Sequence, residues 1–251
     1  MNKTERFEYA GITDIGAQRE SNQDAVFLDA ELGLFGVSDG MGGLSCGEQA
    51  SRFVQEALPL LIRNALGADA APPSAEEGAE LLRSAVCRLS DSFYEQLNAD
   101  GVVAGATVTA LWLLGSKAVI VSLGDSRAYL LRALRRQPQQ LTEDMNLAAL
   151  LVREGALSRE EALHHPSASQ LTAFMGMPSP ATPSVHIVDV HSGDRFLLCT
   201  DGLYAMVEES EMGEILRSCR DGEKICRLLV ERANIAGGRD NISAVYLRLM
   251  R

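Results

Sequence analysis

The stretch Gly33-Leu-Phe-Gly-Val-Ser-Asp-Gly-Met-Gly-Gly43 joins an apolar run to an acid and a group of glycines. Its first half, Gly33 to Val37, predicts a short buried strand. Asp39 follows, and the glycines after it permit close backbone approach or a positive φ angle. A helical pattern begins at about Gly47, so we expect a strand, an acid, a glycine turn and a helix. An Asp-Gly pair is also an ordinary turn signal, which leaves two interpretations of Asp39 open.

Composition and charge limit the kinds of partner. The chain has 251 residues, 46% hydrophobic and 23% charged, which is ordinary for a globular protein. A net charge of −11 argues against nucleic acid or an anionic membrane as the main partner. We find no apolar run of about 18 residues and no signal-peptide pattern, so we expect a cytoplasmic protein. The five cysteines form no Cys-x-x-Cys pair and indicate free thiols, not a zinc site.

Hydrophobic periodicity predicts alternating groups of strands and helices in one domain spanning residues 1–251. Helical spacing of apolar residues occurs over residues 50–61, 82–97, 146–154, 158–163, 208–218 and 223–236. Strand patterns occur over residues 6–15, 25–29, 33–37, 107–114, 118–123, 127–131, 185–190, 195–199 and 242–249.

Short links within residues 107–131 predict an antiparallel meander. Gly115-Ser-Lys117 joins the first two of these strands, and Gly124-Asp-Ser126 joins the last two. Residues 142–183 then interrupt the strand pattern with an excursion that contains helices of its own. Such an excursion is typical of a lid or binding loop, and a plain surface insertion is an equal alternative.

Five acids lie where predicted strands begin or end. They are Asp24, Asp39, Asp125, Asp201 and Asp240. If the strands lie side by side, all five meet at one rim, where like charges repel and raise pKa values. Divalent cations relieve that repulsion, and oxygen-only ligands suit Mg²⁺ or Mn²⁺. Each acid alone is more often a turn residue, so the whole set carries the metal interpretation. Arg19 adds a planar guanidinium that matches phosphate oxygens.

Six motifs occur in the order of a known family and span about residues 10–248. They are Gly16-x-x-Arg19-x-x-Asn22-x-Asp24, Ser38-Asp-Gly-Met-Gly-Gly43, Gly105-Ala-Thr107, Gly124-Asp-Ser-Arg127, Cys199-Thr-Asp-Gly-Leu203 and Gly238-Arg-Asp-Asn-Ile-Ser243. In these residues the chain resembles the PPM family, the metal-dependent type 2C serine/threonine phosphatases, in its compact bacterial form. The resemblance implies an α+β fold, a four-layer α-β-β-α sandwich with two central antiparallel sheets.

The resemblance also implies roles for the acids. Asp39 would bridge two Mn²⁺ or Mg²⁺ ions, with the Gly40 carbonyl on one of them. Asp201 and Asp240 would complete the shell of the other ion. Asp125, together with Asp201, would hold a third and weaker ion. In the same way, the resemblance implies that Arg19 binds the substrate phosphate and that Asp24 lies close to metal-bound waters.

The activity implied by the resemblance is hydrolysis of phosphoserine and phosphothreonine in proteins. Metal-bound water would be the nucleophile, and the cations would neutralise the phosphoryl oxygens. The expected partners are a phosphorylated protein and a cognate Ser/Thr kinase, and we expect a monomer. Gln23 and Met41 depart from the family, since many relatives carry Glu and animal enzymes carry His there. Residues 142–183 correspond to the family's flap.

Two other interpretations compete with the metal enzyme. Cys46-Gly-Glu-Gln-Ala-Ser-Arg52 has the Cys-x5-Arg spacing of cysteine-dependent phosphatases, whose loop cradles phosphate beside a thiolate. No His precedes this Cys, and the residues after it read as a helix. The second alternative is a PPM-fold regulatory or binding module with weak catalysis. The presence of Asp39, Asp201 and Asp240 favours the active enzyme.

Overall fold

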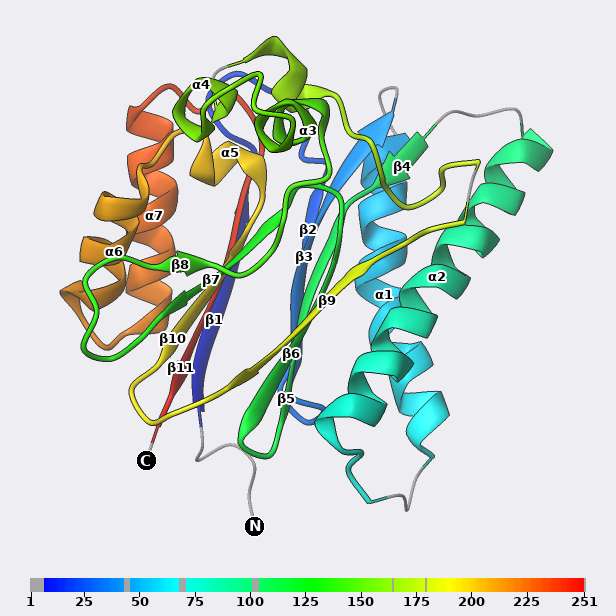
Figure 1. Ribbon diagram of the computed structural model, residues 1–251, viewed down its shortest axis with the longest axis horizontal. Helices are drawn as coiled ribbons and strands as arrows, with labels where there is room; N and C mark the ends of the chain where they lie inside the picture. The colour runs from blue at the N-terminus through cyan, green and yellow to red at the C-terminus, as the bar shows by residue number, and fades with distance from the viewer. Residues whose placement is uncertain are drawn as a thin grey trace.

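Two antiparallel sheets pack face to face, and helices cover both outer faces (Figure 1). The computed structural model describes residues 7–42, 46–67, 71–100, 104–163, 165–178 and 180–250. The layers follow the order α-β-β-α, so the predicted α+β sandwich is confirmed.

Each sheet is assembled from strands that are distant in the sequence. The first sheet has the order β1 (Phe7–Asp14), β11 (Ile242–Leu249), β10 (Arg195–Cys199), β7 (Arg127–Leu131) and β8 (Gln139–Gln140). The second sheet has the order β2 (Asp24–Asp29), β3 (Leu34–Gly42), β5 (Val108–Leu114), β6 (Lys117–Leu123) and β9 (Ser184–Asp189), and β4 (Ala104–Ala106) pairs with the end of β3.

Long amphipathic helices form the outer layers, as their periodicity predicts. Helices α6 (Glu209–Ser218) and α7 (Gly222–Ile235) lie on the first sheet, and α1 (Cys46–Leu66) and α2 (Ala75–Asp100) lie on the second (Figure 1). The short helices α3 (Leu147–Arg153), α4 (Arg159–Leu163), η2 (Pro166–Ser169) and α5 (Asp201–Tyr204) gather at one end of the sandwich. Strand β1 begins and strand β11 ends toward the opposite end (Figure 1).

Apolar side chains fill the three spaces between the four layers. Strand β3 illustrates why its sequence is almost continuously apolar. Phe35 and Val37 belong to the cluster between the sheets, whereas Leu34 belongs to the cluster under α1 and α2. A strand that is buried on both faces has no polar side to alternate with.

The meander prediction is right for β5 and β6 but wrong for β6 and β7. Strands β5 and β6 pair directly, whereas β7 pairs with β10 in the other sheet. Gly124 makes the crossing possible, since its φ angle is +107° and a Cβ atom there would lie 2.6 Å from Cγ2 of Thr107. The crossing brings Asp125 to the rim between the two sheets.

The expected glycine turn after Asp39 is also wrong. Strand β3 continues through Asp39 to Gly42, and its last residues pair with β4. Gly40 is needed for close approach, because a Cβ atom there would lie 1.9 Å from the carbonyl oxygen of Gly47 at the start of α1. Gly43, the last residue of the quoted stretch, lies outside the described residues.

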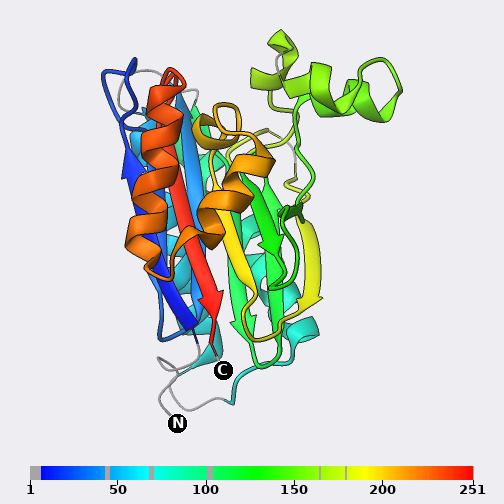
Figure 2. The ribbon, with the colours of Figure 1, turned by 90° about the vertical axis from the view of Figure 1, so that its left-hand side faces the viewer.

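The excursion over residues 142–183 projects from the body of the sandwich (Figure 2). It contains α3, α4 and η2, so the two helices predicted there are confirmed. Two isolated bridges close its base, one between Asn146 and Leu171 and one between Ala106 and Met175. The first bridge joins the two arms of the excursion to each other, and the second attaches the returning arm to β4. The Met145 N–H attaches the outgoing arm to the Gly124 carbonyl at the crossing.

Candidate active site

The structure brings the five predicted acids to one rim from both sheets. Asp24 and Asp39 face each other in register on β2 and β3. The other three lie in the β6–β7 crossing, at the first residue of α5 and just before β11: Asp125, Asp201 and Asp240. The charges of all four other carboxylates add to burial in raising the pKa of Asp39, which places the five groups within electrostatic range of one another.

Burial is the largest cause of the raised pKa values at this rim. It raises the pKa of Asp24 to about 7, of Asp125 to about 8 and of Asp201 to about 6. Neighbouring carboxylates push each value in the same direction. The rim therefore resists full ionisation unless a cation compensates the charges.

Two carboxylate oxygens at the rim are buried and have no hydrogen-bond partner within the described ranges. They are Oδ1 of Asp24 and Oδ1 of Asp201. The other oxygen of Asp24 accepts a hydrogen bond from the Thr200 hydroxyl at 2.7 Å. Buried acceptors normally find a donor, and an all-oxygen set is the donor chemistry that Mg²⁺ and Mn²⁺ prefer. The residues present thus fit a divalent cation.

The carboxylates are nevertheless not preassembled into a coordination shell. Among the residues that the structure describes, no three acidic, His or Cys side chains are arranged to hold a metal ion. Asp240 illustrates the reason, because Arg19 donates to its Oδ2 at 2.6 Å and the Asn241 N–H donates to its Oδ1 at 2.8 Å. Mutual repulsion of the carboxylates also keeps them from gathering into a coordination shell.

Arg19 lies at the rim on a loop that Asn241 holds in place. Arg19 is half-exposed and pairs with Asp240. Asn241 donates to the carbonyls of Ile15 and Ser21, both at 2.9 Å, and accepts from the Gln23 N–H at 2.8 Å. Sequence reasoning gave Asn241 no role of its own. Its position directly after a candidate ligand and directly before a strand was the available signal.

A buried ion pair that the sequence did not indicate lies beside Asp125. Arg127 donates to both carboxylate oxygens of Asp144, with a shortest distance of 2.6 Å, and to the Tyr129 hydroxyl at 2.9 Å. Its guanidinium also lies over the Tyr204 ring, 3.7 Å from the centroid. This network fixes the base of the excursion to β7, next to the rim.

The cysteine-dependent alternative finds no support in the geometry. Cys46 is the first residue of α1, so the residues after it are helical and do not form a phosphate-binding loop. Arg52 is largely exposed and pairs with Glu48 on the same helix at 2.8 Å. The Cys-x5-Arg spacing is therefore coincidental.

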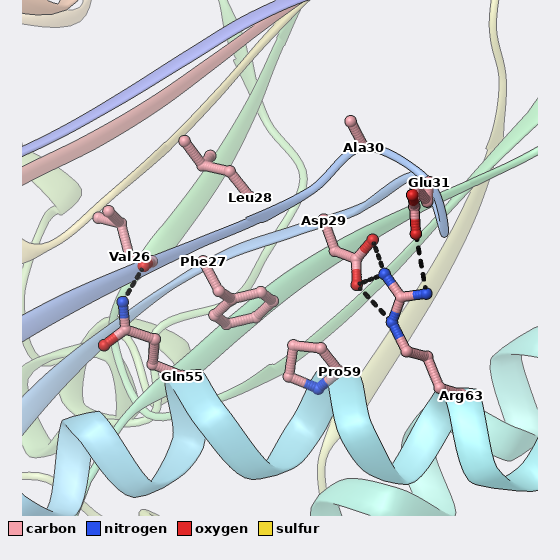
Figure 3. Close-up of a pocket in the computed structure, with 9 residues that line it drawn as sticks. All are labelled: Val26, Phe27, Leu28, Asp29, Ala30, Glu31, Gln55, Pro59 and Arg63. Atoms are coloured by element: carbon pink, nitrogen blue, oxygen red, sulfur yellow. Dashed lines mark hydrogen bonds and ion pairs between the residues drawn. The ribbon is translucent and has the colours of Figure 1, made fainter. Parts of the chain in front are cut away.

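A hollow of about 580 Å³ lies between β2 and α1, away from the acids of the rim (Figure 3). Phe27 and Pro59 line it, and Arg63 pairs with Asp29 and Glu31 at one end. None of the five rim carboxylates lines this hollow. We therefore do not assign it to the candidate active site.

Comparison with known proteins defines the family. Residues 16–236 match the family model described as Protein phosphatase 2C. A Listeria monocytogenes protein named serine/threonine phosphatase stp is 34% identical over 240 residues, which are 94% of this chain and 93% of the relative. The chain therefore belongs to the protein phosphatase 2C family, the class that the six sequence motifs indicated.

Solved structures of the family agree with the fold. The serine/threonine phosphatase Stp1 from Staphylococcus aureus superposes with a TM-score of 0.88 at 27% identity, over 98% of this chain and 96% of that chain. The catalytic domain of the serine/threonine protein phosphatase PstP, solved with two manganese ions, gives a TM-score of 0.81 at 29% identity, over 98% of this chain and 99% of that chain.

None of the helices in the described part of the chain is both long enough and apolar enough to cross a bilayer.

Proposed function

We propose that this protein hydrolyses phosphoserine and phosphothreonine in phosphoproteins and needs divalent cations to do so. The carrying observation is the rim of five carboxylates beside the guanidinium of Arg19, where Asp24 and Asp201 each have a buried oxygen without a hydrogen-bond partner among the described residues. Relatives of the same family are named serine/threonine phosphatases, and another is named a protein phosphatase; these names support this reaction.

We propose the following roles for the individual residues of the rim. We assign Asp39, Asp201 and Asp240 to two Mn²⁺ or Mg²⁺ ions, with the carbonyl of Gly40 as a further ligand. Asp125, near Asp201, is assigned to a third and weaker ion. The PstP structure with two manganese ions supports the first two sites.

Two further residues act on the substrate side. Arg19 can hold the phosphate of the substrate through its planar pair of donors, once a cation relieves Asp240 of its pairing. Asp24 keeps one oxygen on Thr200 and leaves the other free to accept a proton or hydrogen bond from water at the rim. When bound, the cations would supply an activated water and neutralise charge on the phosphoryl group.

The cellular setting is proposed from the class of reaction. A phosphoprotein phosphatase acts against a Ser/Thr kinase, so we propose a cognate kinase as partner. We further propose a cytoplasmic monomer in which residues 1–251 form one domain and residues 142–183 serve as a flap over the substrate.

The test is hydrolysis of an aryl phosphate and of a phosphothreonine peptide by the purified protein. We expect turnover with Mn²⁺, none in excess EDTA and none by Asp201→Ala. Alkylation of the thiols leaves turnover unchanged if Cys46 takes no part. Full activity in EDTA would contradict the proposal.

The alternative of a binding module is decided by the same experiment. A folded protein without turnover at any Mn²⁺ concentration, but with retained phosphopeptide binding, would favour it. Gln23 is the residue that keeps this alternative open, so Gln23→Glu is the variant to measure next in that case.

A further inference from the structure

Asn146 precedes helix α3 and contacts two different parts of the molecule. Its side chain is buried, with only 4% of the residue exposed. Its Oδ1 atom accepts a hydrogen bond from the Ala149 N–H at 2.9 Å, which caps the helix. Its Nδ2 atom donates to Oδ2 of Asp125 at 3.3 Å. One side chain therefore joins the first helix of the excursion to a carboxylate of the rim.

The main chain around Asn146 fixes this arrangement. The Met145 N–H donates to the Gly124 carbonyl at 3.0 Å, one residue before Asp125. The Thr172 N–H donates to the Met145 carbonyl at 2.8 Å, so the returning arm of the excursion meets the outgoing arm here. The amide of Asn146 thus faces Asp125 because the backbone on both sides is attached to the same place.

Helix capping alone does not explain an asparagine at this position. Serine and aspartate cap helices about as well as asparagine. Among these three, only asparagine both caps with an oxygen and offers an N–H donor of matching length to a neighbouring carboxylate. An aspartate at position 146 would instead set a second negative charge against Asp125.

We propose that Asn146 is a positioning residue that orients the Asp125 carboxylate toward a cation and ties that orientation to the folded start of α3. This inference rests on the metal-binding role proposed above for Asp125. Because one side chain holds both groups, cation binding at Asp125 and order at the start of α3 stabilise each other by the same amount.

The first test separates the donor from the cap. In Asn146→Ser the hydroxyl still accepts from the Ala149 N–H, but it is too short to reach Asp125. Calorimetric titration with Mn²⁺ should show the dissociation constant of the weakest ion raised about tenfold or more, with tighter ions unchanged. Ser158→Ala is the matched control, because Ser158 caps α4 in the same excursion through the Glu161 N–H at 3.2 Å.

The second test uses the unaltered protein. Mn²⁺ at concentrations that fill the weakest site should slow hydrogen exchange of the Ala149 amide, and this effect should be absent from Asn146→Ser. Three results would overturn the inference: unchanged Mn²⁺ affinity in Asn146→Ser, equal weakening in Ser158→Ala, or exchange at Ala149 that ignores Mn²⁺. Neither test uses turnover, so a protein that binds Mn²⁺ without hydrolysing phosphate would defeat the proposed function and leave this inference standing.

Discussion

Two carboxylate environments lie side by side at the rim and differ in their hydrogen-bond partners. Asp144 receives hydrogen bonds on both oxygens from Arg127, and Gln140 adds another at 2.9 Å. Among the residues that the structure describes, Asp24 and Asp201 each have a buried oxygen with no hydrogen-bond partner. The chain thus supplies a guanidinium to the carboxylate that holds the excursion to β7, and we propose that cations from solution compensate the acids of the rim.

Asp240 stands between these two cases. It has a guanidinium partner in Arg19, but both side chains are partly exposed, so solvent weakens the pair. A pair of this kind can exchange partners when a cation and a phosphate arrive. The carboxylates therefore differ in how firmly side chains of the protein hold them: Asp144 most, Asp240 less, and Asp24 and Asp201 least.

The largest expected effect comes from removing a rim carboxylate. Asp39→Asn should lower turnover about a thousandfold or more, since each cation contributes several kcal/mol to the transition state. The same variant should melt at a higher temperature than the unaltered protein in EDTA, because one repelling charge is gone. Steady-state kinetics measures the loss of turnover, and thermal unfolding measures the melting temperature. A lower melting temperature of Asp39→Asn in EDTA would show that the Asp39 carboxylate stabilises the fold even without a cation.

Removing Arg127 should have the opposite signature. Arg127→Met leaves Asp144 buried without its cation and should lower the free energy of unfolding by about 3–5 kcal/mol. Denaturant titration measures this loss. Lys117→Met is the control, because Lys117 pairs with the largely exposed Asp189 and its loss should cost about 1 kcal/mol or less. Equal losses of unfolding free energy in the two variants would show that the buried pair stabilises the fold no more than the exposed pair.

In EDTA, the melting temperature of the protein should fall as pH rises, because of the acids of the rim. Burial raises the pKa values of four rim acids, Asp24, Asp39, Asp125 and Asp201, so the folded state keeps protons that the unfolded chain has released. Their contribution to stability is complete below the ordinary pKa of 3.8 and is lost as pH rises toward about 8, the pKa of Asp125. Asp125→Asn should flatten part of that decline in melting temperature.

Excess Mn²⁺ should reverse this decline, because cation binding requires the deprotonated carboxylates and releases protons. Calorimetry in buffers of different ionisation enthalpy counts the protons released. Binding without proton release near pH 7 would show that the rim acids are already ionised.

The smallest expected effect comes from changing Arg19, the partner of Asp240. Arg19→Lys keeps the positive charge but loses the planar fork of donors. Loss of one charged hydrogen bond, about 1.5 kcal/mol, should raise KM for an aryl phosphate about tenfold with a smaller change in kcat. Arg52→Lys, on the exposed face of α1, should leave both constants unchanged. A large fall in kcat for Arg19→Lys would place Arg19 in the chemical step instead of in binding.

Local patterns in the sequence carried most of the fold and the acids of the site. In the sequence each rim acid lies next to the end of a predicted strand and within a motif, so the five acids are identified together as a set. The strand β3 was shortened in the prediction because glycines weaken a strand signal, whereas here Gly40 serves the close contact with Gly47. Helix α5 has four residues and is too short to show a period.

What the sequence could not supply depends on contacts between distant residues. The crossing at Gly124 is decided by the pairing of β7 with β10, far along the chain. Arg127 meets Asp144, and Asn146 meets Asp125, only because the chain comes back to the rim after β8, before α3 begins. Neither pair has a spacing that distinguishes it from surface charges and turn residues.

The position of β11 in the first sheet has a consequence for how the protein is made. This strand pairs with β1 on one side and β10 on the other, so β1 has no partner strand in its sheet before β11 is present. Asp240 and Asn241, which hold Arg19 and its loop, arrive immediately before it. On the ribosome, β11 emerges after the ten other described strands, so its arrival closes the first sheet and brings Asp240 to the rim in one event.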